Sequence, residues 1–190
     1  MIDFGPACRQ MADLVAGVDD ARLDAATPCT EYAVRDLVRH VDQVAQGFAV
    51  LARGGTGGEY DTRLVGDWPA RVAAHVRAVG AAWDEPAAWR GESAVGGGLA
   101  LANELWGRIA FTEIVVHGWD LAAATGQPFA LPAESLRACL DHVTDFVPRA
   151  PVPQLWGPPV AVPDGAPLID RIVAVTGRRP AWRMPEGGAA

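Results

Sequence analysis

The stretch VRDLVRHVDQVAQGFAVL, residues 34–51, carries the clearest structural pattern in the chain. Its apolar side chains recur every three or four positions, which is the spacing of one face of an α-helix. These side chains are Val34, Leu37, Val38, Val41, Val44, Ala45, Phe48 and Leu51. The pattern predicts an amphipathic helix with one face in a core, and the glycine-rich residues 54–58 end it.

The same periodicity recurs on both sides of this segment. It predicts five further helices, at about 5–18, 68–83, 99–124, 132–146 and 168–176. Gly126 is expected to close the fourth of these helices and Gly177 to cap the last. Residues 84–98 are predicted to form a long loop with a short hairpin, and Val160–Val162 one short strand. The fold class predicted is mostly α: a four-helix bundle with an additional helix and a short irregular C-terminal extension. The bundle takes residues 1–147, and the Pro-rich extension, residues 148–190, packs on the same domain.

The composition excludes several classes of protein. The chain has 190 residues, half of them hydrophobic, and a net charge of −7, which argues against nucleic-acid binding. No apolar run approaches the roughly 18 residues that a membrane span needs, and no signal peptide is recognisable, so a cytoplasmic location is expected. The three cysteines, Cys8, Cys29 and Cys139, are odd in number and widely spaced, so free thiols are expected rather than a disulfide framework.

Three side chains have the chemistry of a metal site. Glu113 and His117 are four residues apart on a predicted helix and therefore share a face. His40 falls at the edge of the apolar stripe of its own helix. Two imidazoles and a carboxylate are the ligands of a catalytic zinc ion, and nickel or iron would also accept them. On spacing alone a surface pair is the more frequent outcome for Glu113 and His117, and nothing in the periodicity joins His40 to them.

Several neighbouring residues were weighed for a role at this site. Asp120, three residues beyond His117, could accept the second N–H of the imidazole, or could instead bond to loop backbone near Gly126. Two tryptophans, Trp106 and Trp119, are candidates for a pocket wall or for the core. His75 and His142 are interpreted as structural or exposed, and the spacing places Arg108 poorly for binding an anion beside the ion.

Two motifs carry a resemblance to a known family. TPCTEYAVRDLVRH, residues 27–40, and TEIVVHGWDLA, residues 112–122, resemble the signatures of the mycothiol-dependent maleylpyruvate isomerase N-terminal family, which belongs to the DinB-like superfamily. The tail, from VAVPD at 160–164 to TGR at 176–178, resembles the ends of small metal-binding members. The resemblance implies a DinB-like bundle in which His40, Glu113 and His117 hold a divalent metal, usually zinc, to which mycothiol is brought.

Two features depart from the family pattern. Tyr32-Ala33 replaces a tryptophan followed by Thr or Ser, so position 33 lacks the hydroxyl that would cap the next helix. Either Thr30 caps that helix instead, or its first turn frays. The chain also lacks room for the larger C-terminal domain of the isomerase, so the substrate site of that enzyme is not assumed.

The function predicted is divalent-metal binding, in a metal-dependent transferase or isomerase that uses a low-molecular-weight thiol such as mycothiol. The alternatives are a metal-dependent hydrolase and a non-catalytic metal- or ligand-binding module. The expected partners are a small-molecule thiol and an electrophilic substrate, without nucleic acid or membrane, and a homodimer is left open. The sequence assigns no catalytic residue beyond the metal ligands and Asp120.

Overall fold

The computed structural model describes residues 1–95, 98–150 and 156–185, and within them the chain is mostly helical, as predicted. The helices are α1 (Gly5–Ala16), α2 (Val34–Ala52), α3 (Trp68–Trp83), α4 (Asn103–Thr125), α5 (Ala133–Phe146) and α6 (Leu168–Val175). Short 3-10 helices cover Asp20–Arg22, Pro86–Trp89 and Val147–Arg149, and two strands, β1 (Glu92–Val95) and β2 (Leu99–Ala102), form one hairpin. No helix in these three ranges is both long and apolar enough to cross a membrane.

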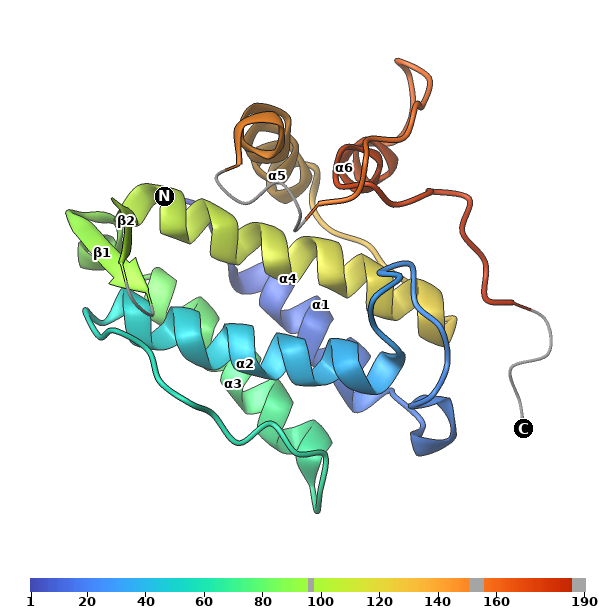
Figure 1. Ribbon diagram of the computed structural model, residues 1–190, viewed down its shortest axis with the longest axis horizontal. Helices are drawn as coiled ribbons and strands as arrows, with labels where there is room; N and C mark the ends of the chain where they lie inside the picture. The colour runs from blue at the N-terminus through green and yellow to red at the C-terminus, as the bar shows by residue number, and fades with distance from the viewer. Residues whose placement is uncertain (96–97, 151–155, 186–190) are drawn as a thin grey trace.

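Helices α1 to α4 form the predicted four-helix bundle. Both α1 and α2 pack against α3 and α4, so the four helices enclose one core (Figure 1). Large apolar side chains fill this core, and Phe4 lies 5.2 Å from Phe111 and 6.1 Å from Trp83 between ring centroids. Burying each such side chain contributes about 1.5–3 kcal/mol, so this packing is a main source of the stability that fixes the helices relative to one another.

The start of α2 is stabilised without a hydroxyl cap. Ala33, which precedes the helix, has no side-chain acceptor, but the Asp36 carboxylate accepts its backbone N–H at 3.3 Å. The N–H groups of Val34 and Arg35 donate to the carbonyls of Ala25 and Leu23. The first turn therefore neither frays nor depends on Thr30, because the preceding chain satisfies its free N–H groups.

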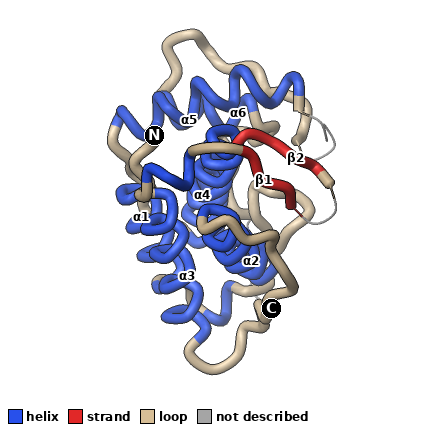
Figure 2. Tube along the Cα trace, turned by 90° about the vertical axis from the view of Figure 1, so that its left-hand side faces the viewer, coloured by secondary structure: helices blue, strands red, loops and turns tan. Residues whose placement is uncertain are grey.

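Helix α4 is the central element of the molecule. It packs against α1 and α2 on one side, while α5 and α6 lie on its other side in both views (Figures 1 and 2). As a result, 15 of its 23 residues are buried. It ends as predicted at Gly126, which adopts a φ of 71°, a left-handed conformation that glycine reaches without strain.

Two predicted elements are wrong in their boundaries or type. Residues 99–102 are not the start of α4 but form β2, which pairs antiparallel with β1 in the register Glu92 with Ala102. Their apolar side chains fit either a helix or a strand, and the pairing with residues 92–95 in a hairpin decides for the strand. Val160–Val162 forms no strand, because within the described residues its only backbone bond is from the Val160 N–H to the Ala174 carbonyl, at the end of a helix.

The C-terminal segment reaches back to α4. Helix α6 packs against α5, and the chain then turns at Gly177, whose φ is 84°. A side chain at Gly177 would lie 2.5 Å from the Cα of Gly157, so the two glycines cross at a distance that only glycine allows. The turn directs the next residue, Arg178, into the interior, where its side chain is 8% exposed.

Candidate metal centre

The three residues singled out as metal ligands lie together in the structure. His40 projects from α2, and Glu113 and His117 project from adjacent turns of α4. The Oε2 atom of Glu113 lies 3.0 Å from Nε2 of His40 and 3.3 Å from Nε2 of His117. Donor atoms bonded at about 2.0–2.1 Å to a tetrahedral zinc ion are separated by about 3.3 Å, so this donor set fits such an ion.

The site is closed on one side and accessible on the other. The side chain of His117 is 9% exposed and that of Glu113 is 19% exposed, whereas that of His40 is 27% exposed. The rings of the two histidines meet edge to face, with centroids 4.8 Å apart, and Tyr32 lies on the outer side of His40 at 5.3 Å. A ligand from solvent therefore approaches beside His40.

A chain of hydrogen bonds fixes the orientation of the His117 ring. Its Nδ1 lies 2.9 Å from Oδ2 of Asp120, a carboxylate that is completely buried. Because a carboxylate only accepts hydrogen bonds, Nδ1 carries the hydrogen and Nε2 faces Glu113. Of the two roles considered for Asp120, the structure contains the contact with the imidazole.

Arg178 balances the charge of Asp120. Its guanidinium donates to both carboxylate oxygens, through Nη2 at 3.0 Å and Nε at 3.3 Å, and through Nη1 to the Thr176 carbonyl at 2.8 Å. A bidentate pair of this kind fixes orientation as well as charge. The sequence did not reveal Arg178 as a site residue, although it lies in the tail motif at 176–178, because nothing in that motif indicates its partner 58 residues away.

The electrostatics of the group favour a charged arrangement. Burial alone would raise the pKa of Glu113, but the hydrogen bonds from His117 and His40 outweigh it and hold that pKa below its usual range. Burial would lower the pKa of His117, but the hydrogen bonds to Asp120 and Glu113 raise it to about 9. The carboxylates of Asp120 and Glu113 on either side of the ring therefore favour positive charge at this position.

Cys29 lies closer to the site than the sequence indicated. Its sulfur and one donor atom each from His117 and Asp120 lie within 4.8 Å of one another. Burial raises the pKa of this thiol, and the nearby Arg178 acts in the opposite direction. Because Arg178 already neutralises Asp120 here, we do not assign a second metal to this group.

The other residues weighed from the sequence lie apart from the three donors. His75 bonds to the buried Asp42 at 2.6 Å and is structural. His142 stacks on Phe146, and burial lowers its pKa to about 4. Arg108 donates to Glu104 on the same helix, away from the site.

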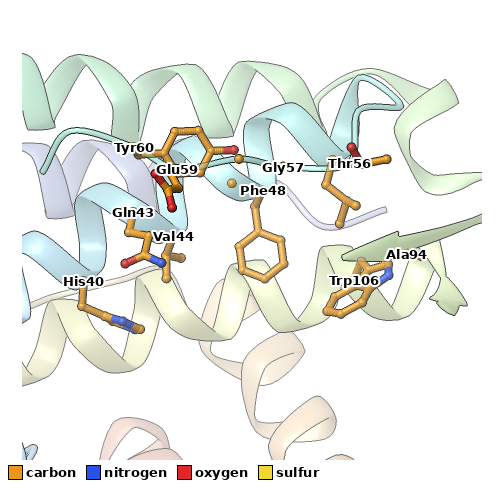
Figure 3. A pocket seen from close by; sticks show the side chains of 13 residues that line it. His40, Gln43, Val44, Phe48, Thr56, Gly57, Glu59, Tyr60, Ala94 and Trp106 are labelled. Atoms are coloured by element: carbon orange, nitrogen blue, oxygen red, sulfur yellow. The ribbon is translucent and has the colours of Figure 1, made fainter. Parts of the chain in front are cut away.

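A pocket of about 700 Å³ begins at His40 and follows α2 (Figure 3). Its walls include Val44 and Phe48 from α2, the segment 56–60, and Trp106 from α4. Trp106 is thus a wall residue, with its indole N–H bonded to the Ser93 carbonyl at 2.9 Å, whereas the half-buried Trp119 is not among the lining residues. The candidate centre therefore has a mostly apolar space beside its accessible ligand.

Comparisons with known proteins identify relatives of the chain. Residues 4–122 match the family described as the mycothiol maleylpyruvate isomerase N-terminal domain. Two proteins of Mycobacterium tuberculosis, from strains CDC 1551 / Oshkosh and H37Rv, are each 34% identical to the chain over 188 residues. These matches cover 88% of this chain and 91% of each relative, and both relatives are described only as uncharacterized proteins.

No solved structure matches the chain. The family match includes His40, Glu113, His117 and Asp120 but ends before Arg178. Since the match covers well over half of the sequence, the chain belongs to the mycothiol maleylpyruvate isomerase N-terminal domain family.

Proposed function

We propose that the chain binds one divalent metal ion, zinc, through His40, Glu113 and His117, and that it acts with a low-molecular-weight thiol as a metal-dependent transferase or isomerase. One observation carries the proposal: three donor atoms from two helices converge at the end of an apolar pocket. The family, which is named for a mycothiol-dependent isomerase, supports mycothiol as the thiol.

The donor set favours zinc with one position left for an exchangeable ligand. Two imidazole nitrogens and one carboxylate oxygen are typical of catalytic zinc, whereas a structural zinc site uses four protein ligands. Nickel and iron accept the same donors, so the choice of zinc rests on the ligand types and on the small separation of the atoms. The free position lies on the side of His40, where the site is accessible.

The chain's own residues prepare this site for a thiol. A metal bound here would lower the pKa of a thiol that joins it and would supply a thiolate at neutral pH. Asp120 keeps Nδ1 of His117 as a hydrogen-bond donor, so the lone pair of Nε2 is directed at the site. Phe48 and Trp106 give the pocket beyond His40 an apolar wall, which favours binding of an apolar electrophile beside the thiol.

Transfer and isomerisation share the same first bond. A thiolate sulfur attacks an electrophilic carbon and a C–S bond forms. In a transferase that bond remains in the product, whereas in an isomerase it breaks again and returns the thiol. The convergence of the three donor atoms supports C–S bond formation, the step that both reactions share. Analysis of the products distinguishes them, because only the product of a transferase keeps the C–S bond.

Metal analysis followed by cobalt substitution tests the proposal. Purified protein should bind about one zinc per chain, and Glu113→Gln should lose most of this binding while Glu104→Gln, an exposed carboxylate on the same helix, should retain it. In cobalt-loaded protein, added mycothiol should produce a sulfur-to-metal charge-transfer band, and His117→Ala should abolish it. Failure to take up zinc would overturn the metal site.

Absence of the charge-transfer band in cobalt protein at saturating thiol would overturn the thiol chemistry alone. A metal-dependent hydrolase or a non-catalytic module would then be the better explanation of the site.

A further inference from the structure

The pocket beside His40 is elongated and mostly apolar. It follows one face of α2 from His40 through Val44 and Phe48 to Leu51. The eleven steps of helix from His40 to Leu51 rise about 16 Å, so the pocket has room for an elongated molecule whose reactive end lies at the metal centre. Phe48 and Trp106, with ring centroids 6.1 Å apart, form an aromatic wall along its length (Figure 3).

Away from the candidate metal centre, positive charge is missing from the pocket. Among the described lining residues there is no arginine, and the only carboxylate is that of Glu59. The chain contains no lysine, and residues 96–97, 151–155 and 186–190 contain no arginine either, so they cannot supply a cation. The buried arginine nearest the candidate ligands, Arg178, already forms a bidentate pair with Asp120.

The polar groups of the pocket are suited to a neutral ligand. The Tyr60 hydroxyl is buried and has no hydrogen-bond partner within the described residues, and the Gln43 amide lies one helical turn from His40. Hydroxyl and amide groups bond to a carbonyl or an ether oxygen without needing opposite charge. A carboxylate in the part of this space remote from the metal centre would lose its hydration without gaining a cation, and Glu59 would repel it.

From these observations we infer that the pocket accepts an elongated, uncharged and largely apolar electrophile, such as an aryl- or alkyl-substituted conjugated ketone. The inference rests on the proposed function for the chemistry of the site, and it specifies the substrate class. It excludes dianionic substrates of the kind to which maleylpyruvate belongs, although the chain shares that enzyme's family.

With such a ketone the proposed reaction needs only the thiol as a second reactant. The sulfur bonds to the β-carbon of the C=C–C=O unit, and the π electrons of the C=C bond shift toward the carbonyl. The thiol hydrogen, released when the thiolate forms, is returned to the α-carbon from solvent. The product is a thioether ketone that contains all atoms of both reactants.

A pair of ligands that differ only in charge tests the inference. The probes are 4-(4-carbamoylphenyl)butan-2-one and its carboxylate counterpart, 4-(4-carboxyphenyl)butan-2-one, which are saturated and therefore do not react with thiols. Calorimetry on the metal-free protein, in which the carboxylate has no zinc ion to bind, should show the amide binding at least about tenfold more tightly than the carboxylate. A carboxylate that binds as tightly as the amide would overturn the inference.

Two variants place the binding in this pocket. Gly47 lines it, and a Cβ there would meet only Tyr60, at 3.8 Å, so Gly47→Leu should fill the pocket and weaken amide binding at least about tenfold without disturbing the core. Gln43→Arg should add the missing cation and reverse the preference in favour of the carboxylate. If neither variant changes the binding of either probe, the ligand does not occupy this pocket and the inference fails.

The same probes separate this inference from the proposed function. If metal-free protein prefers the amide, but zinc-loaded protein forms no thioether from mycothiol and the matching unsaturated ketone, the pocket assignment stands and the thiol chemistry fails. If zinc-loaded protein adds the thiol equally well to neutral and carboxylate ketones, the chemistry stands and the substrate class is wrong.

Discussion

The two histidines of the candidate metal centre are held in different ways. His117 is 9% exposed, and its Nδ1 bonds to a buried carboxylate that is paired in turn with a buried arginine. His40 is 27% exposed, and within the described residues no hydrogen bond to its Nδ1 is present, so beyond Glu113 only ring contacts with His117 and Tyr32 restrain it. One ligand is thus fixed before any metal arrives, while the other has freedom to adjust.

This difference separates two requirements of a working metal site. A rigid ligand increases metal affinity, because its side chain is already oriented and loses little conformational entropy on binding. A mobile ligand beside a pocket lets substrate enter and product leave. The fixed side is built from α4 and the C-terminal segment, and the adjustable side from α2, so substitutions on the two sides should have different consequences.

The largest effect is expected on the fixed side, from His117→Ala. Losing a ligand should lower metal affinity by more than the roughly 100-fold upper range seen when a supporting residue is lost. Competition with a chromophoric chelator measures this. His40→Ala should also weaken metal binding. A larger loss of metal affinity in His40→Ala than in His117→Ala would contradict the contrast between the two histidines.

The next largest effect is expected from Arg178→Ala, because Arg178 bonds to Asp120, which in turn bonds to His117. Removing the guanidinium leaves His117 as the remaining partner of the buried Asp120, so metal affinity should fall by about 10–100-fold and the free energy of unfolding by about 3–5 kcal/mol. Arg178→Lys should restore only part of the metal affinity and of the free energy of unfolding, because a lysine cannot form the bidentate pair that arginine forms. Arg179→Ala, at the exposed neighbouring position, is the matched control and should change neither. Equal effects at 178 and 179 would mean that the tail does not support the site.

A smaller and graded effect is expected from pH. Because the pKa of His117 is raised to about 9, a proton competes with the metal for its Nε2 atom below that pH. Metal affinity should therefore rise about tenfold per pH unit from pH 7 to about 9, and binding should release a proton that a pH indicator can detect in weak buffer. An affinity that does not change between pH 7 and 8 would contradict this assignment.

The smallest effect is expected on the adjustable side, from Gly47→Ala. Glycine in the middle of α2 destabilises the helix by about 0.5–1 kcal/mol relative to alanine, and the added methyl group meets no atom closer than 3.8 Å. The melting temperature should rise slightly and zinc affinity should stay the same. A change in zinc affinity would show that the pocket wall and the metal centre are coupled.

The sequence predicted the parts of the site that depend on helix geometry. Glu113 and His117 share a face because of their spacing, and the apolar stripe of α2 placed His40 at the bundle margin. The convergence of the two helices came from the family resemblance, because periodicity within one helix contains no information on the other. Whether these residues hold a metal stays a prediction.

The remaining differences come from contacts that the periodicity of a single segment does not contain. Residues 99–102 join a strand because residues 92–95 are available to pair with them, and Val160–Val162 finds no such partner in the described chain. The hydroxyl that position 33 lacks is replaced by carbonyls at residues 23 and 25. Arg178 could not be assigned because its partner, Asp120, lies in another helix, and a lone arginine in a tail is usually solvated.

The pairing of Asp120 with Arg178 has a consequence for the order in which the protein matures. The ribosome makes the chain from the N-terminus, so all three candidate ligands emerge long before Arg178, which follows His117 by 61 residues. A nascent chain that folds its bundle early encloses the Asp120 carboxylate without its arginine partner until the segment around residue 178 is made and docks. Full metal affinity is therefore expected only once Arg178 has docked, and a protein cut short before residue 178 would contain every candidate ligand and still load its metal poorly.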